Sequence, residues 1–283
     1  MKLPLLIGLF ACLAANSSAA DNYSFVVLNH STFYSLVRVS PEGKYLSTIA
    51  SGFAGEGMAK DAEGNYMVTT ISGLIRVSPS GGVSPVATAP AGSHWMKIVQ
   101  GPGGASIVTD NIQHALWSIS RDGRSIAKIA TYPVSNYNER EDTSLAMDSQ
   151  GNYMLLEDNH PEARLFRITP EGAVTQIPLS RSLRASYALV ADGPGSYLAQ
   201  EGRGDSIIRI AAAGEVTELA RFVPGHINLT GIARDPATGE ILATCTREHA
   251  ILRISPDGRT ASTLTNSATY IKDPLAILVE VGQ

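Results

Sequence analysis

Cysteine is scarce in this chain of 283 residues, which contains only Cys12 and Cys245. Cys12 lies in an N-terminal apolar segment that we expect to be removed, so the mature chain keeps one thiol and forms no intramolecular disulfide. An exported protein of this size folds without one because its apolar core is large enough. Cys245 lies in the strand-like run ILATCTR, which predicts a buried, unreactive thiol.

Long hydrophobic runs are absent beyond the first 20 residues. Lys2 precedes the apolar run LPLLIGLFACLAA (3–15), and the small residues SAA (18–20) follow it. This order predicts a secretory signal peptide over residues 1–20 and a secreted or periplasmic protein. The run is too short for a membrane anchor, which needs roughly 18 apolar residues. The same shortness disfavours lipid attachment at Cys12.

Charge of either sign is also sparse, since charged residues make up 17% of the chain and the net charge is -4. Weak, dispersed negative charge excludes a nucleic-acid partner. The Gly-x-Ser-x-Gly elbow, phosphate loops, zinc-spaced His/Cys sets and haem-attachment motifs are missing too, which disfavours serine hydrolysis and nucleotide chemistry. The 26 glycines and 15 prolines suit many short strands joined by turns.

The chain does contain a motif of one strand and one tight turn that is repeated six times. Apolar and polar residues alternate before each turn, as in a half-buried strand, and Pro and Gly suit the turn itself. The copies are LVRVSPEG (36–43), LIRVSPSG (74–81), LWSISRDG (116–123), LFRITPEG (165–172), IIRIAAAG (207–214) and ILRISPDG (251–258). Their closing glycines recur at intervals of 38 to 49 residues.

A second unit, strand, Asp/Gly turn and strand, lies upstream of these copies, as in AKDAEGNYMVTT (59–70) and AMDSQGNYMLLE (146–157). A β-rich run follows each copy, so one repeat holds four antiparallel strands, named A to D from the axis outward. Four strands in about 43 residues make one propeller blade. We therefore predict an all-β, six-bladed β-propeller, formed as a single and monomeric domain by residues 21–283.

The two chain ends complement each other in this prediction. The N-terminus supplies only three strands before the second blade, and the C-terminus ends in the lone strand LAILVEV (275–281). Pairing of this strand beside residues 23–29 completes the first blade and removes an exposed sheet edge. A stacked, open solenoid would not need such a strand.

The repeats resemble those of the NHL-type and gluconolactonase-like (senescence-marker) group of six-bladed propellers. The fourth, GNYMLLEDNHPEARLFRITPEGAVTQIPL (151–179), is similar to a repeat of the virginiamycin B lyase family. The resemblance covers the whole mature chain as architecture. It implies a fold more than an activity, because propellers host many unrelated functions.

Blade geometry places the A–B and C–D turns on one face and the B–C and D–A loops on the other, around the mouth of the central channel. We call the second face the ligand face, since ligands usually bind there. Its most suggestive segment is the long acidic loop SNYNEREDTS (135–144). The gluconolactonase-like resemblance implies a divalent cation (calcium, magnesium or zinc) held by oxygen ligands. The candidate ligands are Glu56, Asp110, Asn111, Asp142 and Glu157. That family's ligand motifs are absent, so these residues are chosen by position alone.

Histidines suggest acid–base catalysis on the same face. His30, His94 and His226 belong to different blades, and a histidine near a carboxylate exchanges protons near neutral pH. The resemblance to virginiamycin B lyases implies a histidine that opens a lactone by elimination with a metal, and Glu157 matches the Glu after their strand B. The candidate catalytic residues are thus His94, His226 and Glu157.

Three functions remain open. The first is a divalent-metal-dependent lactonase or lyase acting on a small molecule at the channel mouth. The second is a non-catalytic NHL-type module that binds a protein, peptide or glycan through exposed aromatic rings, for which the candidates are Trp95, Tyr132, Tyr137 and Tyr187. The third is a metal-free propeller that shapes a reactive biosynthetic substrate. What distinguishes them is which side chains converge in space.

Overall fold

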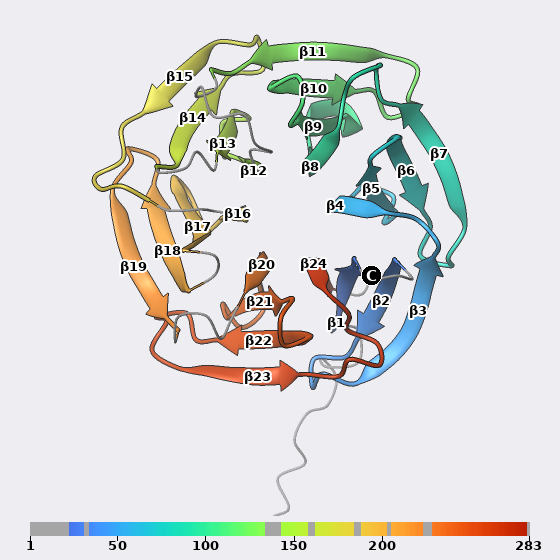
Figure 1. Cartoon of the computed structure of the whole chain (residues 1–283), viewed down its shortest axis with the longest axis vertical. Coiled ribbons are helices and arrows are strands. Elements are labelled where there is room, and N and C mark those ends of the chain that lie inside the picture. The colour runs from blue at the N-terminus through green and yellow to red at the C-terminus, as the bar shows by residue number, and fades with distance from the viewer. Residues whose placement is uncertain are drawn as a thin grey trace, which may run out of the picture.

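The computed structural model describes residues 23–30, 34–133, 143–157, 162–183, 188–202, 205–222 and 228–281. These residues form 24 strands and one short 3-10 helix, Pro102–Gly104. The strands make six separate four-stranded antiparallel sheets, arranged radially around a central axis (Figure 1). The predicted six-bladed propeller is confirmed. The predicted signal peptide lies outside the described residues.

Each blade runs from an inner strand at the axis to an outer strand at the rim (Figure 1). In that order, blade 1 is β24 (Pro274–Val281), β1 (Tyr23–Asn29), β2 (Ser35–Val39) and β3 (Tyr45–Ser51); blade 2 is β4 (Gly55–Lys60), β5 (Tyr66–Thr70), β6 (Gly73–Val77) and β7 (Val83–Thr88); blade 3 is β8 (Trp95–Gln100), β9 (Ser106–Asp110), β10 (Ala115–Ile119) and β11 (Ile126–Thr131). Blade 4 is β12 (Thr143–Met147), β13 (Tyr153–Glu157), β14 (Arg164–Ile168) and β15 (Val174–Ile177); blade 5 is β16 (Leu189–Ala191), β17 (Ser196–Glu201), β18 (Ser206–Ala211) and β19 (Val216–Arg221); blade 6 is β20 (Leu229–Arg234), β21 (Ile241–Cys245), β22 (Ala250–Ile254) and β23 (Ala261–Thr265).

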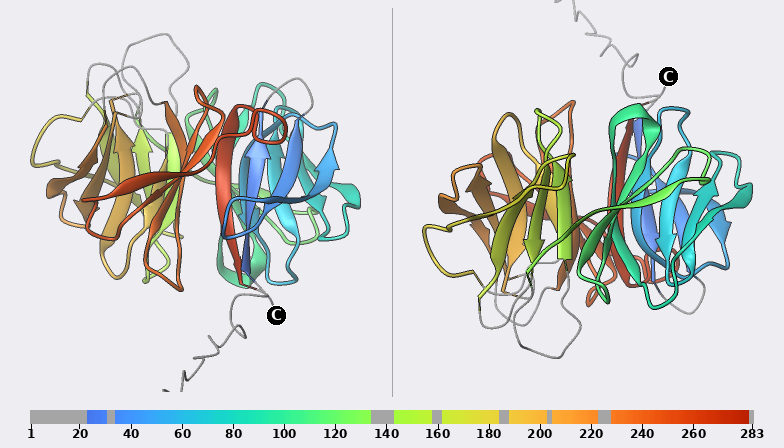
Figure 2. Two further views of the ribbon diagram at one scale, coloured as in Figure 1. Left: turned by 90° about the horizontal axis from the view of Figure 1, so that it is seen from below. Right: turned by 90° about the horizontal axis from the view of Figure 1, so that it is seen from above.

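The ring closes as the orphan strand predicts. β24 pairs antiparallel with β1, from Tyr23 opposite Val281 to Asn29 opposite Pro274. Figure 2 shows the two strands side by side although they come from opposite ends of the chain. Among the described residues, no helix has the length and hydropathy that a bilayer crossing requires.

Apolar side chains fill the seams between blades. Phe25, Tyr66, Trp95 and Phe166 are among the largest fully buried side chains, and Cys245 is buried as expected. The cluster that contains Cys245 joins strands of blades 5 and 6, so the core is a ring of inter-blade contacts. Burial of apolar area in these seams fixes the blades against one another.

The glycine of the C–D turn has a second role that the sequence did not reveal. Gly81 has a φ of +93°, the backbone conformation that the turn requires. A Cβ atom at this position would also lie 2.3 Å from the carbonyl oxygen of Ile49 in the preceding blade. The repeated glycine therefore lets each C–D turn approach the outer strand of its neighbour.

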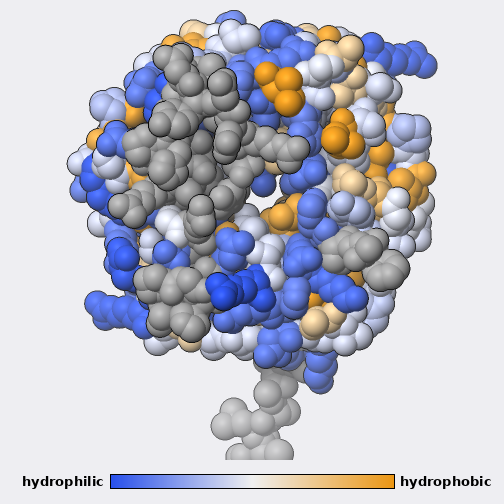
Figure 3. Space-filling view, in the orientation of Figure 1, coloured by the Kyte–Doolittle hydropathy of each residue, from blue (hydrophilic) through white to orange (hydrophobic). Residues whose placement is uncertain are grey.

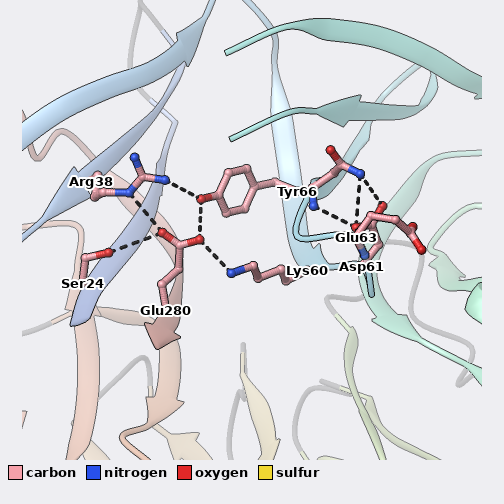
Figure 4. A network of polar contacts seen from close by, with 8 residues as sticks. Ser24, Arg38, Lys60, Asp61, Glu63, Tyr66 and Glu280 are labelled. Atoms are coloured by element: carbon pink, nitrogen blue, oxygen red, sulfur yellow. Dashed lines mark hydrogen bonds and ion pairs between the residues drawn. The ribbon is translucent and has the colours of Figure 1, made fainter. Parts of the chain in front are cut away.

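A polar network closes the seam between blades 1 and 2 on the face opposite the ligand face (Figure 4). Glu280, near the end of β24, accepts hydrogen bonds from Lys60 Nζ (2.8 Å), Tyr66 Oη (2.7 Å) and Arg38 Nε (3.0 Å). Burial opposes ionisation of Glu280, but these hydrogen bonds and the two cations outweigh burial, so its pKa lies below the usual value. In blades 2 and 5 the carboxylate that pairs with the arginine of strand C comes from the A–B turn. In blade 5, for example, Asp192 of this turn pairs with Arg209. Blade 1 has chain ends in place of that turn, and Glu280 replaces the missing acid.

Candidate functional site

Inner strands of several blades begin with a β-bulge on the ligand face. In blade 2, Gly55 pairs with Thr70 and Gly57 with Thr69, which leaves Glu56 as the extra residue. Bulges recur at the start of the inner strands of blades 3, 6 and 1, where the extra residues are Met96 with Lys97, Thr230, and Leu275. A bulge interrupts the alternation of side chains and re-aims the extra residue. Glu56, Lys97, Thr230 and Leu275 accordingly line the central channel.

Buried threonines on the second strands support these bulges. Thr109 Oγ1 accepts a hydrogen bond from the backbone N–H of Lys97 (3.0 Å), and Thr244 Oγ1 accepts one from Gly231 (2.8 Å). In blade 4 the equivalent residue is Leu156, and β12 pairs with β13 without a bulge. The threonine that recurs in MVTT, IVTD and LATC is a sequence signal for these bulges.

Two histidines meet one carboxylate at the channel rim. Nε2 of His30, just after β1, and Nε2 of His94, just before β8, each lie 3.9 Å from Oε1 of Glu56. The side chains of Glu56 and His94 are 18% and 22% exposed, so solvent reaches a partly enclosed group. Nε2 of His94 is itself buried and has no hydrogen-bond partner among the described residues. At 3.9 Å the groups are too far apart for direct hydrogen bonds, and a water or a ligand oxygen can bridge them.

Asp110 and Asn111, predicted as metal ligands, instead hold the loops that carry this cluster. Asp110 is fully buried, and its Oδ1 accepts the backbone N–H groups of His94 (3.1 Å), Ile112 and Gln113 (both 3.0 Å). The backbone N–H of Asn111 donates to the carbonyl oxygen of His94 at 3.1 Å. Both residues therefore fix the backbone of His94 and position its imidazole.

Glu157, predicted both as a catalytic residue and as a metal ligand, is fully buried and forms an ion pair with Arg164. Nε of Arg164 donates to Oε2 of Glu157 at 2.8 Å, because the two residues are direct cross-strand neighbours. Among the described residues, no three His, Cys, Asp or Glu side chains are grouped so that they could hold a metal ion. Asp142 and His226 lie outside the described residues, so their roles stay predictions.

Of the four aromatic residues predicted as contacts of a binding module, the two that the structure describes are buried. Trp95 is fully buried and Tyr132 is 3% exposed, with its hydroxyl donating to the carbonyl oxygen of Asp110 at 3.3 Å. Tyr137 and Tyr187 lie outside the described residues. Two aliphatic side chains are exposed instead, Ile71 (64%) and Ile112 (58%), in the B–C turns of blades 2 and 3.

Below the cluster, a channel of about 330 Å³ is lined by the inner strands of all six blades. Figure 3 views the ligand face, which is hollowed at its centre where the channel opens. Most of the lining side chains are aliphatic. They include Met58, Ile98, Val99, Leu145, Val190, Ile232, Ile277 and Leu278.

The chain matches no family model and no curated protein. It is similar in fold to solved β-propellers. A chain of a nidogen/laminin complex superimposes with a TM-score of 0.74 and 11% identity, over 92% of this chain and 99% of that chain. A streptogramin B lyase gives a TM-score of 0.62 and 17% identity, over 92% and 78%. A catalytically inactive histidine-to-alanine variant of virginiamycin B lyase from Staphylococcus aureus, with quinupristin, gives 0.60 and 16%, over 90% and 78%. At these identities the likeness establishes the propeller fold.

Proposed function

We propose that the protein is an enzyme that opens a lactone, or a similar cyclic ester, by acid–base catalysis at the mouth of its channel. One observation carries the proposal. A carboxylate on the inner strand of blade 2 faces two imidazoles from separate loops, at the rim of a channel that can hold a small molecule. Glu56, His30 and His94 thus combine a carboxylate with two imidazoles, the side-chain types that serve as general bases and acids in catalysis.

The cluster suits both routes of ring opening. In hydrolysis, Glu56 takes a proton from water, the water oxygen bonds to the ester carbonyl carbon, and His94 protonates the leaving alkoxide as the carbon–oxygen bond breaks. In elimination, the base removes a proton from the carbon adjacent to the carbon that bears the ester oxygen. The C–H electron pair forms a double bond, and the carboxylate leaves. The likeness to streptogramin B lyases, including one with an inactivating histidine substitution, supports the second route.

The predicted divalent cation plays no part in these steps. Oδ1 of Asp110 accepts loop backbone N–H groups, Oδ1 of Asn111 accepts from Thr143, and Oε2 of Glu157 pairs with Arg164. Among the described residues these oxygens do not gather into the oxygen-rich ligand set that such a cation takes. Calcium, magnesium or zinc stays a prediction that metal analysis of the dialysed protein tests. Chelator-sensitive ring opening would contradict the metal-free assignment.

A lactone panel tests the proposal directly. The variants Glu56→Gln and His94→Asn should lower kcat/KM by about 10²–10⁴-fold, the usual effect of removing a general acid or base. Glu248→Gln is the matched control for Glu56→Gln, because Glu248 is an exposed carboxylate in a B–C turn of the same face. Product mass separates the routes, since hydrolysis adds one water and elimination adds nothing. Unchanged ring opening by Glu56→Gln would refute the assignment.

The exposed Ile71 and Ile112 favour a second candidate, the docking of a protein partner on blades 2 and 3. The likeness to a chain of a nidogen/laminin complex supports a protein as the partner. Immobilised wild-type protein should then retain a binding protein that the double variant Ile71→Asp, Ile112→Asp does not retain. Equal retention by both proteins would eliminate this surface.

A further inference from the structure

We infer that the channel receives an apolar arm of the substrate, so that the substrate is a lactone bearing an alkyl or acyl chain. The inference rests on the proposed function for the reacting end of the molecule and adds what binds behind it. The starting point is the continuity of two features. Glu56, which faces the two histidines, is also a wall residue of the channel, so a ligand held at the cluster has direct access to the channel.

The wall below the rim suits hydrocarbon. Each blade contributes aliphatic side chains at this depth, such as Met58 from blade 2, Ile98 from blade 3 and Leu145 from blade 4. Blades 5, 6 and 1 add Val190, Ile232, Ile277 and Leu278. The volume of about 330 Å³ falls within the usual range of small-molecule sites, which begins at about 300 Å³. The channel therefore has room for a small hydrocarbon arm.

The length of the channel limits the arm. Glu56 and Lys60 are wall residues at the two ends of β4, four steps apart, which corresponds to about 13 Å at the rise of a β-strand. Lys60 is held by Glu280 at 2.8 Å, so the far end of the wall is ionic. An arm that reaches this end gains nothing from further methylenes.

This geometry predicts that the affinity for lactones rises with the length of their alkyl side chain and then stays constant. Each methylene buried in the channel is worth about 0.8 kcal/mol, or about a fourfold gain in affinity. The probes are γ-butyrolactones with ethyl, butyl, hexyl, octyl and decyl side chains. Their Kd values are measured by calorimetry on the full chain and on Glu56→Gln, which separates binding from turnover.

One substitution tests the length of the channel. Ala191 is a wall residue of β16 and is already exposed, so a larger side chain there does not disturb the core. Ala191→Trp should stop the gain at a shorter side chain than in the wild type. Val83→Trp, on the exposed outer strand of blade 2, should leave the series unchanged. Melting temperatures confirm that each variant is folded.

The outcomes separate this inference from the proposed function. Binding that depends on the length of the alkyl side chain, without ring opening, would overturn the enzymatic proposal and support the inference that the channel receives an apolar arm. Ring opening with a Kd independent of chain length, or an unchanged series in Ala191→Trp, would overturn the apolar arm and keep the enzyme. We expect ring opening together with an affinity gain of about tenfold or more for each two-carbon extension up to the limit.

Discussion

Replacing Glu280 by alanine should destabilise the ring at the seam that joins the two chain ends. The side chain is 12% exposed and is the shared acceptor for Arg38, Lys60 and Tyr66. Breaking a buried ion pair costs about 3–5 kcal/mol, and breaking an exposed one about 0–1 kcal/mol. Arg38 and Lys60 are 26% and 31% exposed, so water partly solvates them in the variant. We therefore expect the free energy of unfolding to fall by about 2–3 kcal/mol.

Urea-induced unfolding followed by circular dichroism measures this loss, and the thermal midpoint should fall by about 4–12 °C. Glu218→Ala is the matched control, because Glu218 pairs with Arg221 on the exposed outer strand of blade 5. Its effect should stay within about 0.5 kcal/mol. Equal losses in the two variants would refute the reasoning, since the seam would then contribute no more than a surface ion pair.

Three further predictions concern the scaffold and the rim. Gly81→Ala should lower the free energy of unfolding by about 1–3 kcal/mol in urea titrations. The alanine would have to adopt the positive φ of Gly81, and its Cβ would clash with the carbonyl oxygen of Ile49. Thr109→Val removes the acceptor of the Lys97 N–H and should lower the free energy of unfolding by about 1–3 kcal/mol. As the bulge relaxes, kcat should change by a larger factor than KM. Because the pKa of Glu280 is lowered in the folded protein, its stabilisation is complete above the unfolded-state pKa of about 4.3 and is lost as the pH falls through the folded-state pKa. The free energy of unfolding of Glu280→Gln should therefore fall less steeply than that of the wild type as the pH is lowered through this range.

The blades were predictable because their signals are local. Strand C, its turn and strand D are consecutive in the chain, so one short motif reports the hairpin wherever it recurs. The lone C-terminal strand then required a partner, and only the incomplete first blade lacked one. The second constraint on Gly81 was not predictable, because it comes from Ile49, in a different blade.

The sequence predicted on which face of the propeller the site lies, but it did not predict which side chains lie close together there. The sequence placed His94 and Glu56 on the ligand face but assigned them to different hypotheses, because their proximity depends on how neighbouring blades pack. The pairing of Glu157 with Arg164 follows from the register of one hairpin, in which the two residues are directly opposite. Register depends on loop geometry that the residue pattern does not specify, so the pattern alone placed Glu157 among the candidate ligands.

Ring closure and the candidate site depend on the same seam. His30 belongs to blade 1 and Glu56 to blade 2, and the N–H of His30 donates to the carbonyl oxygen of Asp273, immediately before β24, at 3.0 Å. The other end of β24 holds Glu280, which binds Lys60 at the far end of the strand that carries Glu56. The closing strand therefore anchors the backbone of His30 at the ligand face, and it ties blade 1 to blade 2 at the opposite face. A propeller whose C-terminal strand is detached should keep the contiguous blades and lose this part of the cluster.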